Sequence, residues 1–472
     1  MGSLFKRSLL AAAVAGTFAA SGAAHATNGM DLEGYGPIAT AMGGASIAYD
    51  NGTAAMMNNP ATLGLMAEGS SRLDIAVGKL GPDVTSTGPA AYGSPEADSD
   101  GTAYYMPAAG WAMKNGKMTY GVGLFAQGGM GTEYDDDTWM GGGTGQDARS
   151  EVSVGRFMVP FAYDVTQELT LAASADFVWG GMDMKMPMPI FNPISGTATP
   201  GTFADFFTDF GGSQIMGEGT VTPGLATALG NAVAAGYDTV ALNFSNSSDY
   251  TGEASATGYG FKLGALYKVN SNVTLGAMYQ SETNLGDWKG DGEMVMYDVD
   301  GANPAQTING KVKIKDFQWP ATYGVGAAYS ADRWMVAGDI KVIQWSGVMK
   351  DFKLTFTPDG MSGESADLTM YQDWDDQTVF ELGGAYKATD QLTLRAGVNI
   401  ADNPIPNSYV NPLFPAIVED HYTAGVGYAF NQQNDLNFSL TYAPEVKVTN
   451  SNTGVEITHS QLNWQLMYSY MF

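Results

Sequence analysis

The chain has 472 residues, no cysteine, and 49 acidic against 22 basic residues, which gives a formal net charge of −27. A chain this acidic is disfavoured as a partner of nucleic acid or anionic lipid, and without cysteine it holds no disulfide or thiolate metal site. Sixty-one glycines and 24 tyrosines favour one large β structure over several soluble helical domains.

The first 26 residues have the pattern of a secretory signal peptide. Lys6 and Arg7 precede an apolar run from Leu9 to Ala20, and small residues around His25 form a cleavage site before Thr27. The apolar run is too short to span a bilayer, which disfavours a membrane anchor. We expect cleavage after residue 26 and exclude residues 1–26 from the fold.

Residues 27–68 contain no clear strand and consist largely of small side chains. Short helices are expected at Pro37–Ala41 and Thr53–Met57. We interpret residues 27–68 as a compact N-terminal plug, and a flexible leader is the alternative.

Residues 69–472 alternate between apolar and polar side chains in segments joined by two kinds of connection. Tight turns are expected at Asn115-Gly116, Thr166-Gln167, Asn270 to Asn272, Ala331-Asp332, Thr389-Asp390 and Asn431 to Asn434. Long loops are expected at 83–101, 128–150, 183–253, 286–309, 357–375, 402–417 and 448–456. A β-sandwich would not sort its loops in this way, whereas short turns on one side and long loops on the other are typical of an antiparallel transmembrane β-barrel of about fourteen strands.

The last strand shows the alternation most clearly. Its aromatic and aliphatic residues share one face and suit lipid: Leu462, Trp464, Leu466, Tyr468, Tyr470 and Phe472. The terminal Phe472 also resembles the signature by which barrels are recognised for assembly, so the barrel assembly machinery is an expected partner. The same alternation in two earlier strands points Arg395 and His421 into the lumen.

The longest expected loop, residues 183–253, carries much apolar surface. Thr222 as N-cap and Pro223 at the first helical position predict a helix within it. Its methionines and aromatic residues either form an adaptable surface for hydrophobic ligands or only the loop's own core. The candidate ligand-binding residues in this loop are Met184, Met186, Met188, Phe191, Phe206 and Phe207.

Three stretches together resemble the FadL/TodX family of outer-membrane transporters of long-chain fatty acids and hydrocarbons. They are GGASIAYDNGTAAMMNNPATL at 43–63, the segment DFQWPATYGVGAAYSADRWMVAGDIKVIQWSGV at 316–348, and residues 374–430 with the run LTLRAGVNIADNPIP. The resemblance implies a fourteen-stranded barrel closed by an N-terminal hatch, in which Asn59, Pro60 and Ala61 contact the barrel wall. It also implies passive, hatch-gated uptake of hydrophobic compounds, foremost long-chain fatty acids, with sideways exit beside a kinked strand. Glycines between residues 121 and 131 are candidates for that kink, and glycine-rich external turns are the alternative.

A fatty-acid ligand needs a cation in the lumen, and Arg395 is the first candidate to meet its carboxylate. Arg156, Lys341 and His421 are further candidates on the same argument. Structural ion pairs with lumen acids such as Asp339 or Glu381 are the alternative for Arg395.

Two other function classes share the barrel. A nonspecific porin or adhesin would need neither plug nor apolar loop, and a barrel lipid hydrolase would need a catalytic constellation. His421 and His459 are the imidazole bases left in the mature sequence, without a G-x-S-x-G motif, so we do not expect an enzyme. No cofactor or metal is expected. The expected partners are a hydrophobic small molecule, outer-membrane lipid and lipopolysaccharide, and the expected form is a monomer in the cell outer membrane.

Overall fold

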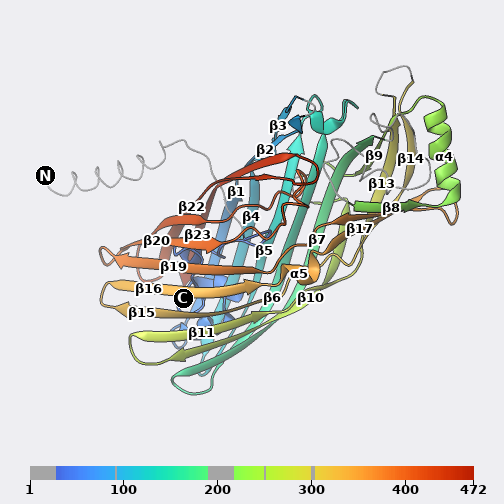
Figure 1. Ribbon diagram of the computed structural model, residues 1–472. Coiled ribbons are helices and arrows are strands. Elements are labelled where there is room, and N and C mark those ends of the chain that lie inside the picture. Colours follow the sequence, from blue (N-terminus) through green and yellow to red (C-terminus); the bar gives the residue numbers. More distant parts are fainter. Residues whose placement is uncertain (1–27, 91–92, 190–216, 249–250, 299–302) are drawn as a thin grey trace.

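Antiparallel strands close into a ring in the computed structural model, which describes residues 28–472 apart from 91–92, 190–216, 249–250 and 299–302 (Figure 1). Fourteen of the described strands form this ring, because β23 pairs back with β1. In ring order they are β1 (Ser71–Leu80), β4 (Tyr104–Asn115), β5 (Met118–Tyr134), β6 (Ala148–Asp164), β7 (Leu169–Pro189), β10 (Ala254–Lys268), β11 (Val273–Gln280), β15 (Thr322–Ala331), β16 (Trp334–Ile343), β19 (Gln377–Lys387), β20 (Leu392–Ala401), β21 (His421–Ala429), β22 (Asn434–Thr449) and β23 (Glu456–Met471). Because the ring is closed, each of its strands pairs with a neighbour on both sides over at least part of its length.

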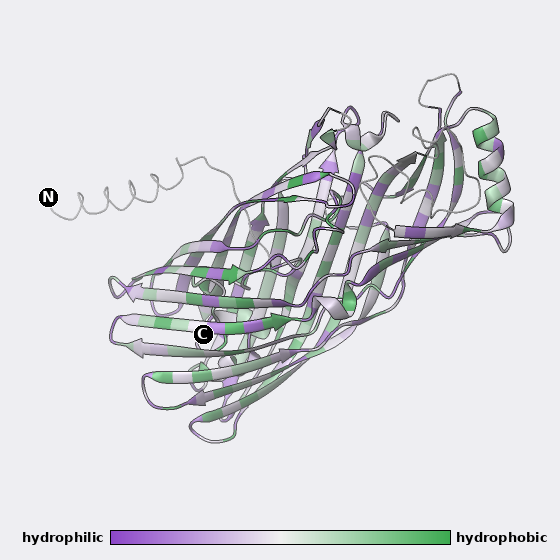
Figure 2. Ribbon diagram, in the orientation of Figure 1, coloured by the Kyte–Doolittle hydropathy of each residue, from purple (hydrophilic) through white to green (hydrophobic). Residues whose placement is uncertain are grey.

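Side chains alternate between the two faces of the wall, and apolar and polar residues alternate with them along the strands (Figure 2). In β23, Tyr468 is 41% exposed and its neighbour Met467 is 2% exposed. The outward face predicted for residues 462–472 is therefore confirmed, as is the inward placement of His421 and Arg395. In the described part of the chain, no helix is long and apolar enough to cross a membrane.

The two kinds of connection lie at opposite ends of the barrel, here named the turn end and the loop end. All six predicted tight turns join neighbouring ring strands. The predicted loops are partly wrong, because strands extend into them: β5 and β6 reach into 128–150, and β7 runs on to Pro189. Strand pairing thus continues beyond the barrel at the loop end.

A second sheet extends from β7 at the loop end. Its strands pair in the order β7, β9 (Thr239–Phe244), β13 (Trp288–Tyr297), β14 (Gln306–Lys315), β17 (Asp351–Pro358), β18 (Ala366–Tyr371) and β8 (Gly217–Val221). The shorter strands are β2 (Pro82–Thr87), β3 (Glu96–Asp98) and β12 (Asn284–Leu285). One face of this sheet packs into a large apolar core, which rigidifies the loop end.

The helix predicted within the longest loop is α4 (Pro223–Ala234), with Thr222 as its N-cap residue. The Thr222 hydroxyl does not cap it. The carboxylate of Glu364 instead accepts hydrogen bonds from the backbone N–H groups of Gly224 (2.7 Å) and Leu225 (3.1 Å). A negative charge at the positive end of the helix fixes α4 to the loop that follows β17.

Residues 28–66, here named the N-terminal segment, lie inside the ring towards its turn end (Figure 1) and are almost entirely buried. They form α2 (Pro37–Thr40), a 3₁₀ turn η1 (Gly52–Met56) and a second one, η2 (Pro60–Leu65). Short helices were predicted near the first two positions, whereas η2 was not.

Charged side chains of the wall hold the backbone of the N-terminal segment. Asp339 on β16 accepts from the N–H groups of Ser46 (2.6 Å) and Ile47 (2.9 Å). Lys114 on β4 donates to the carbonyl oxygen of Gly64 at 2.5 Å. Charge-assisted hydrogen bonds of this kind are stronger than neutral ones, so the segment is anchored at separate points around the wall.

Candidate functional site

The pairing between β4 and β5 stops half-way along the two strands. It runs from Asn115 with Met118 to Ala108 with Phe125, and β5 then carries a bulge between Ala126 and Gly128 in its register with β6. Residues 104–107 of β4 remain paired with β1. A bulge bends the strand that contains it, so β5 leaves β4 at this point and the wall has a gap towards the loop end.

The start of the N-terminal segment lies at this gap. Asp31 forms an isolated bridge with Gly128, and the N–H of Gly129 donates to the carbonyl oxygen of Met30 at 3.1 Å. A Cβ atom on Gly128 would lie 2.1 Å from that same oxygen, so a residue with a side chain does not fit there. The N-terminal segment therefore supplies β5 with a partner where β4 no longer does.

A polar network fixes this contact from the lumen side. Oδ1 of Asp31 accepts hydrogen bonds from Nε1 of Trp319 at 2.6 Å and from Nε2 of Gln127 at 3.4 Å. The hydroxyl of Tyr35 donates to the carbonyl oxygen of Gln127 at 2.7 Å. The guanidinium of Arg156 bonds the Gln127 side chain through Nε. Burial nevertheless raises the pKa of Asp31 above its ordinary value.

A cavity of about 110 Å³ occupies the gap. Three consecutive residues of β4, Tyr104, Tyr105 and Met106, all line it. Consecutive residues of a strand point to opposite faces, so the cavity reaches both the lumen and the outer surface of the wall. The 51% exposure of Tyr105 agrees with this. Among the described residues that line the cavity, none is a lysine or an arginine.

The loop between β20 and β21, residues 402–420, folds inward and covers the cavity at the loop end; we name it the roof loop. Pro415 and Ala416 line the cavity. The carbonyl oxygen of Pro412 accepts from the hydroxyls of Thr132 (3.1 Å) and Tyr134 (3.0 Å), and that of Pro415 is bonded by Nδ1 of His459 (2.6 Å). Side chains from two ring strands, β5 and β23, thus hold the loop through its carbonyl groups.

Three tryptophans meet beside the gap. Trp319 and Trp345 are edge to face with ring centroids 6.1 Å apart, and Trp345 and Trp374 are 5.2 Å apart in the same manner. All three are at most 1% exposed. Gly29 packs so closely on Trp345 that a Cβ atom would lie 2.8 Å from the indole ring. The tryptophans of two separate sequence stretches, 316–348 and 374–430, therefore come together against the start of the N-terminal segment.

A protein-family model described as outer membrane protein transport protein (OMPP1/FadL/TodX) matches residues 12–468. The chain belongs to this family. It is an outer-membrane β-barrel of a family whose members transport hydrophobic compounds, and not of a family of enzymes.

Among solved structures, the P. putida toluene transporter TodX is 30% identical, with a TM-score of 0.78 over 94% of this chain and 99% of TodX. A long-chain fatty acid transport protein of Escherichia coli O157:H7 is 24% identical over 77% of this chain and 76% of its own length. An uncharacterized protein of Chlorobium limicola is 56% identical over 62 residues, which are 13% of this chain and 30% of that protein.

The four lumen residues predicted to meet a ligand have partners within the FadL/TodX barrel. Arg156 is fully buried and its Nη1 lies 2.9 Å from Oδ2 of Asp176. Nζ of Lys341 lies 2.6 Å from Oε1 of Glu381. Arg395 donates to Asn437 at 3.0 Å, and His421 is buried opposite Asn399 in the β20–β21 register. None of the four lines the gap cavity among its described residues, and a carboxylate-binding role for them stays a prediction.

The methionines predicted for an external loop surface are in a different environment. Met184 and Met186 belong to β7 and are at most 4% exposed within the apolar core, where their backbone pairs with β9. Met188 also belongs to β7 and pairs with Val240. Phe191, Phe206 and Phe207 lie outside the described residues. The loop interpretation of 183–189 is thus wrong, because the alternating side chains continue the barrel strand.

Asn59 contacts both the N-terminal segment and the wall. Its side-chain amide donates to the carbonyl oxygens of Ile47 (2.7 Å) and of Ala265 on β10 (3.2 Å), and its Oδ1 accepts from the N–H of Ala61 (3.1 Å). Pro60 begins η2. The geometry is that of a contact between segment and wall, while its part in gating is a proposal.

The residues missed at the sequence level are Asp31, Gln127 and Trp319. Glycines between residues 121 and 131 were candidates for a kink, and the structure has the bulge at Gln127, within this run. Nothing in the spacing of Asp31 and Trp319 indicates that they meet, because they are 288 positions apart.

Proposed function

We propose that this FadL/TodX family member takes up small uncharged hydrophobic compounds by passive diffusion, and that they leave the barrel sideways through the gap between β4 and β5. The observation that carries this proposal is the cavity lined by three consecutive β4 residues, which joins the lumen to the lipid-facing surface. An apolar compound gains about 0.8 kcal/mol for each methylene that leaves water, so a dry path that ends in lipid needs no energy source.

The size and lining of the cavity favour an uncharged ligand. The gap cavity, at about 110 Å³, is smaller than the apolar cavity of roughly 150 Å³ that accommodates benzene, so it suits a single small ring at most. The described lining holds no lysine or arginine and includes the carboxylate of Glu151, which disfavours an anionic ligand. The similarity to a toluene transporter over nearly the whole chain agrees with this class.

Long-chain fatty acids are the second candidate. The similarity to a long-chain fatty acid transport protein favours them, as does the inward-pointing Arg395. On this alternative the carboxylate would have to displace Asn437 from Arg395. Uptake of oleate but not of toluene by cells that produce the protein would select it.

In the proposed cycle the ligand passes the roof loop, enters the cavity and leaves between β4 and β5 when residues 28–31 withdraw from Gly128 and Gly129. The N-terminal segment is then the hatch. Sideways exit also distinguishes this function from a porin, since a wide open pore would conduct ions in a planar bilayer and the proposal expects no large steady conductance.

Uptake of labelled toluene tests the proposal in cells that lack or carry the gene. Ala126→Trp places a large ring in the gap cavity and is expected to reduce protein-dependent uptake at least tenfold. Val336→Trp is the matched control, because Val336 on β16 is 48% exposed on the outer face and does not line the cavity. Equal toluene uptake by both variants and the unaltered protein, at equal surface abundance, would exclude exit through the gap.

A further inference from the structure

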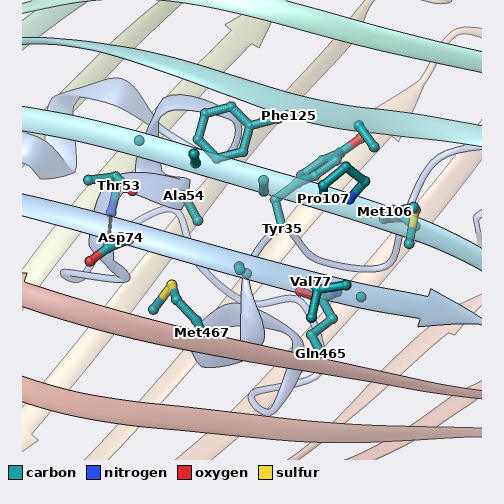
Figure 3. Close-up of a pocket in the computed structure, with 18 residues that line it drawn as sticks. Tyr35, Thr53, Ala54, Asp74, Val77, Met106, Pro107, Phe125, Gln465 and Met467 are labelled. Atoms are coloured by element: carbon teal, nitrogen blue, oxygen red, sulfur yellow. Dashed lines mark hydrogen bonds between the residues drawn. The ribbon is translucent and has the colours of Figure 1, made fainter.

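A second, smaller cavity of about 30 Å³ lies next to the gap cavity on the side of the turn end, between the N-terminal segment and strands β1 and β4 (Figure 3). We name it the lower cavity and the gap cavity the upper one. Small residues of three elements line much of it: Gly36, Ala54, Ala76, Gly78, Ala108 and Gly110. Tyr35 and Phe125 cover its middle, and Thr53 and Asp74 lie at the end away from Met106 (Figure 3).

Two residues, Met106 and Ala126, line both cavities. Ala126 offers a single methyl group, so the larger barrier between the two spaces is the side chain of Met106. The Met106 side chain reaches across to the neighbouring strand, because its Cε lies 3.5 Å from the position that a Cβ atom would take on Gly78 of β1. Methionine is unbranched and flexible, so it fills such a space without fixing it rigidly.

We propose that Met106 sets the length limit of the transported compound by closing the lower end of the upper cavity. This inference rests on the proposed function and adds which ligands the site accepts. With Met106 in place, the upper cavity of about 110 Å³ has room for a single small ring at most. An alkyl chain on that ring points at the Met106 thioether and enters the lower cavity only if that side chain moves aside.

The lower cavity suits the uncharged tail of such a compound and not a second polar head. Its lining between the two ends is mostly alanine, glycine and aromatic carbon. The far end carries the Asp74 carboxylate, whose Oδ2 accepts from the N–H of Thr53 at 2.6 Å. An anionic head group placed there meets a like charge, so the joined cavities favour neutral alkylbenzenes over fatty acids.

The test compares uptake of labelled toluene and n-hexylbenzene by cells that produce equal surface amounts of each variant. Met106→Ala joins the two cavities, and each methylene that the joined space takes from water improves acceptance about fourfold. We expect the hexylbenzene-to-toluene uptake ratio to rise at least tenfold in this variant. Met106→Phe fills the passage more rigidly and is expected to lower the ratio.

Met130→Ala is the matched control. Met130 is the other methionine that lines the upper cavity, and it does not line the lower one. Its truncation enlarges the upper cavity without joining the two, so the ratio is expected to stay within about twofold of the unaltered protein. Heat-modifiable migration in gels reports that each barrel has folded.

Two outcomes overturn the inference. An unchanged ratio in Met106→Ala, with toluene uptake intact, shows that this side chain does not limit length. An equal rise of the hexylbenzene-to-toluene uptake ratio in Met130→Ala shows that the ratio depends on the total cavity volume. It then does not depend on whether Met106 separates the two cavities. Failure of the unaltered protein to take up either compound overturns the proposed function and this inference with it.

Discussion

The carboxylate of Asp31 accepts a hydrogen bond from the indole N–H of Trp319 at 2.6 Å, and both groups are buried. Asp31 lies in the N-terminal segment, and Trp319 lies in the connection between β14 and β15. This bond holds residues 28–31 against the bulge of β5 and therefore keeps the gap covered from inside. Removing the indole N–H of Trp319 is therefore expected to weaken the contact between residues 28–31 and β5.

Trp319→Phe keeps most of the ring volume and removes the indole N–H. Loss of a hydrogen bond to a buried charged group costs about 1.5–3 kcal/mol. We expect amide hydrogen exchange of residues 28–35 to accelerate by at least tenfold and toluene uptake to rise. Trp334→Phe is the control, because Trp334 is 61% exposed on the outer face. Unchanged exchange in Trp319→Phe would show that Asp31 is held by its other donors.

The lumen ion pair of Arg156 and Asp176 yields a second prediction. Both side chains are fully buried, so Arg156→Met leaves a buried carboxylate with fewer partners, which costs about 3–5 kcal/mol. We expect a clearly lower urea midpoint for unfolding from micelles. Lys311→Met breaks an exposed pair with Asp291 and is expected to shift the midpoint little. Equal shifts in both variants would contradict a structural role for the buried pair.

The ionisation of Glu33 makes the stability of the buried N-terminal segment depend on pH. Burial raises the pKa of its carboxyl from the ordinary 4.5 to about 7, although Thr441 donates a hydrogen bond to Oε1 at 2.7 Å. Between these two values the folded protein keeps a proton that the unfolded chain has released. The contribution of Glu33 to stability is therefore highest below pH 4.5, and it falls by about 3 kcal/mol as the pH rises to 7.

Hydrogen exchange of residues 28–45 measures this effect. Exchange-derived opening is expected to become easier from pH 5 to pH 8 in the unaltered protein, after correction for the intrinsic exchange rate. Glu33→Gln cannot ionise, so much of this pH dependence is expected to disappear. Asp31 also has a raised pKa, and its contribution remains in that variant. The same pH dependence in both proteins would assign it to Asp31 or to other groups.

The barrel was predictable from sequence because lipid on one side and a polar lumen on the other impose a period of two on every strand. Leu462, Tyr468 and Phe472 show that period without any tertiary information. The same period was present in the methionines of 182–188, although this stretch was assigned to the longest expected loop. Proline is tolerated at the end of β7 because pairing with β6 ends at Lys185, so that Pro187 and Pro189 have a neighbouring strand, β9, on one side alone.

The candidate site was predictable only in part. The glycines between residues 121 and 131 predicted either a kink or glycine-rich external turns, since few other residues allow such close backbone approach. The partner of each lumen charge was not predictable, because it depends on where distant strands meet when the ring closes. Arg395 was ranked ahead of Arg156 and Lys341 on the sequence. In the structure Arg156 and Lys341 have acids within 2.9 Å, and Arg395 has an amide.

The last prediction concerns the roof loop. Because the sequence contains no cysteine, a crosslinker reacts with introduced cysteines alone. The hydroxyl of Ser150 on β6 bonds the carbonyl oxygen of Leu413, so cysteines at these two positions are close enough for a short, reversible bis-thiosulfonate crosslinker. If ligands pass the roof loop, crosslinked Ser150→Cys/Leu413→Cys is expected to lose at least nine tenths of toluene uptake. A reducing agent is expected to restore it.

Thr449→Cys/Glu456→Cys is the matched pair, because these residues face each other on β22 and β23 at the loop end without joining the roof loop. Its crosslinking is expected to leave uptake unchanged, which separates closure of the roof from general stiffening of the barrel. Full uptake by the crosslinked Ser150/Leu413 pair would show that ligands reach the gap cavity by another route. In that case the roof loop is a fixed wall of the cavity, and the N-terminal segment alone controls passage.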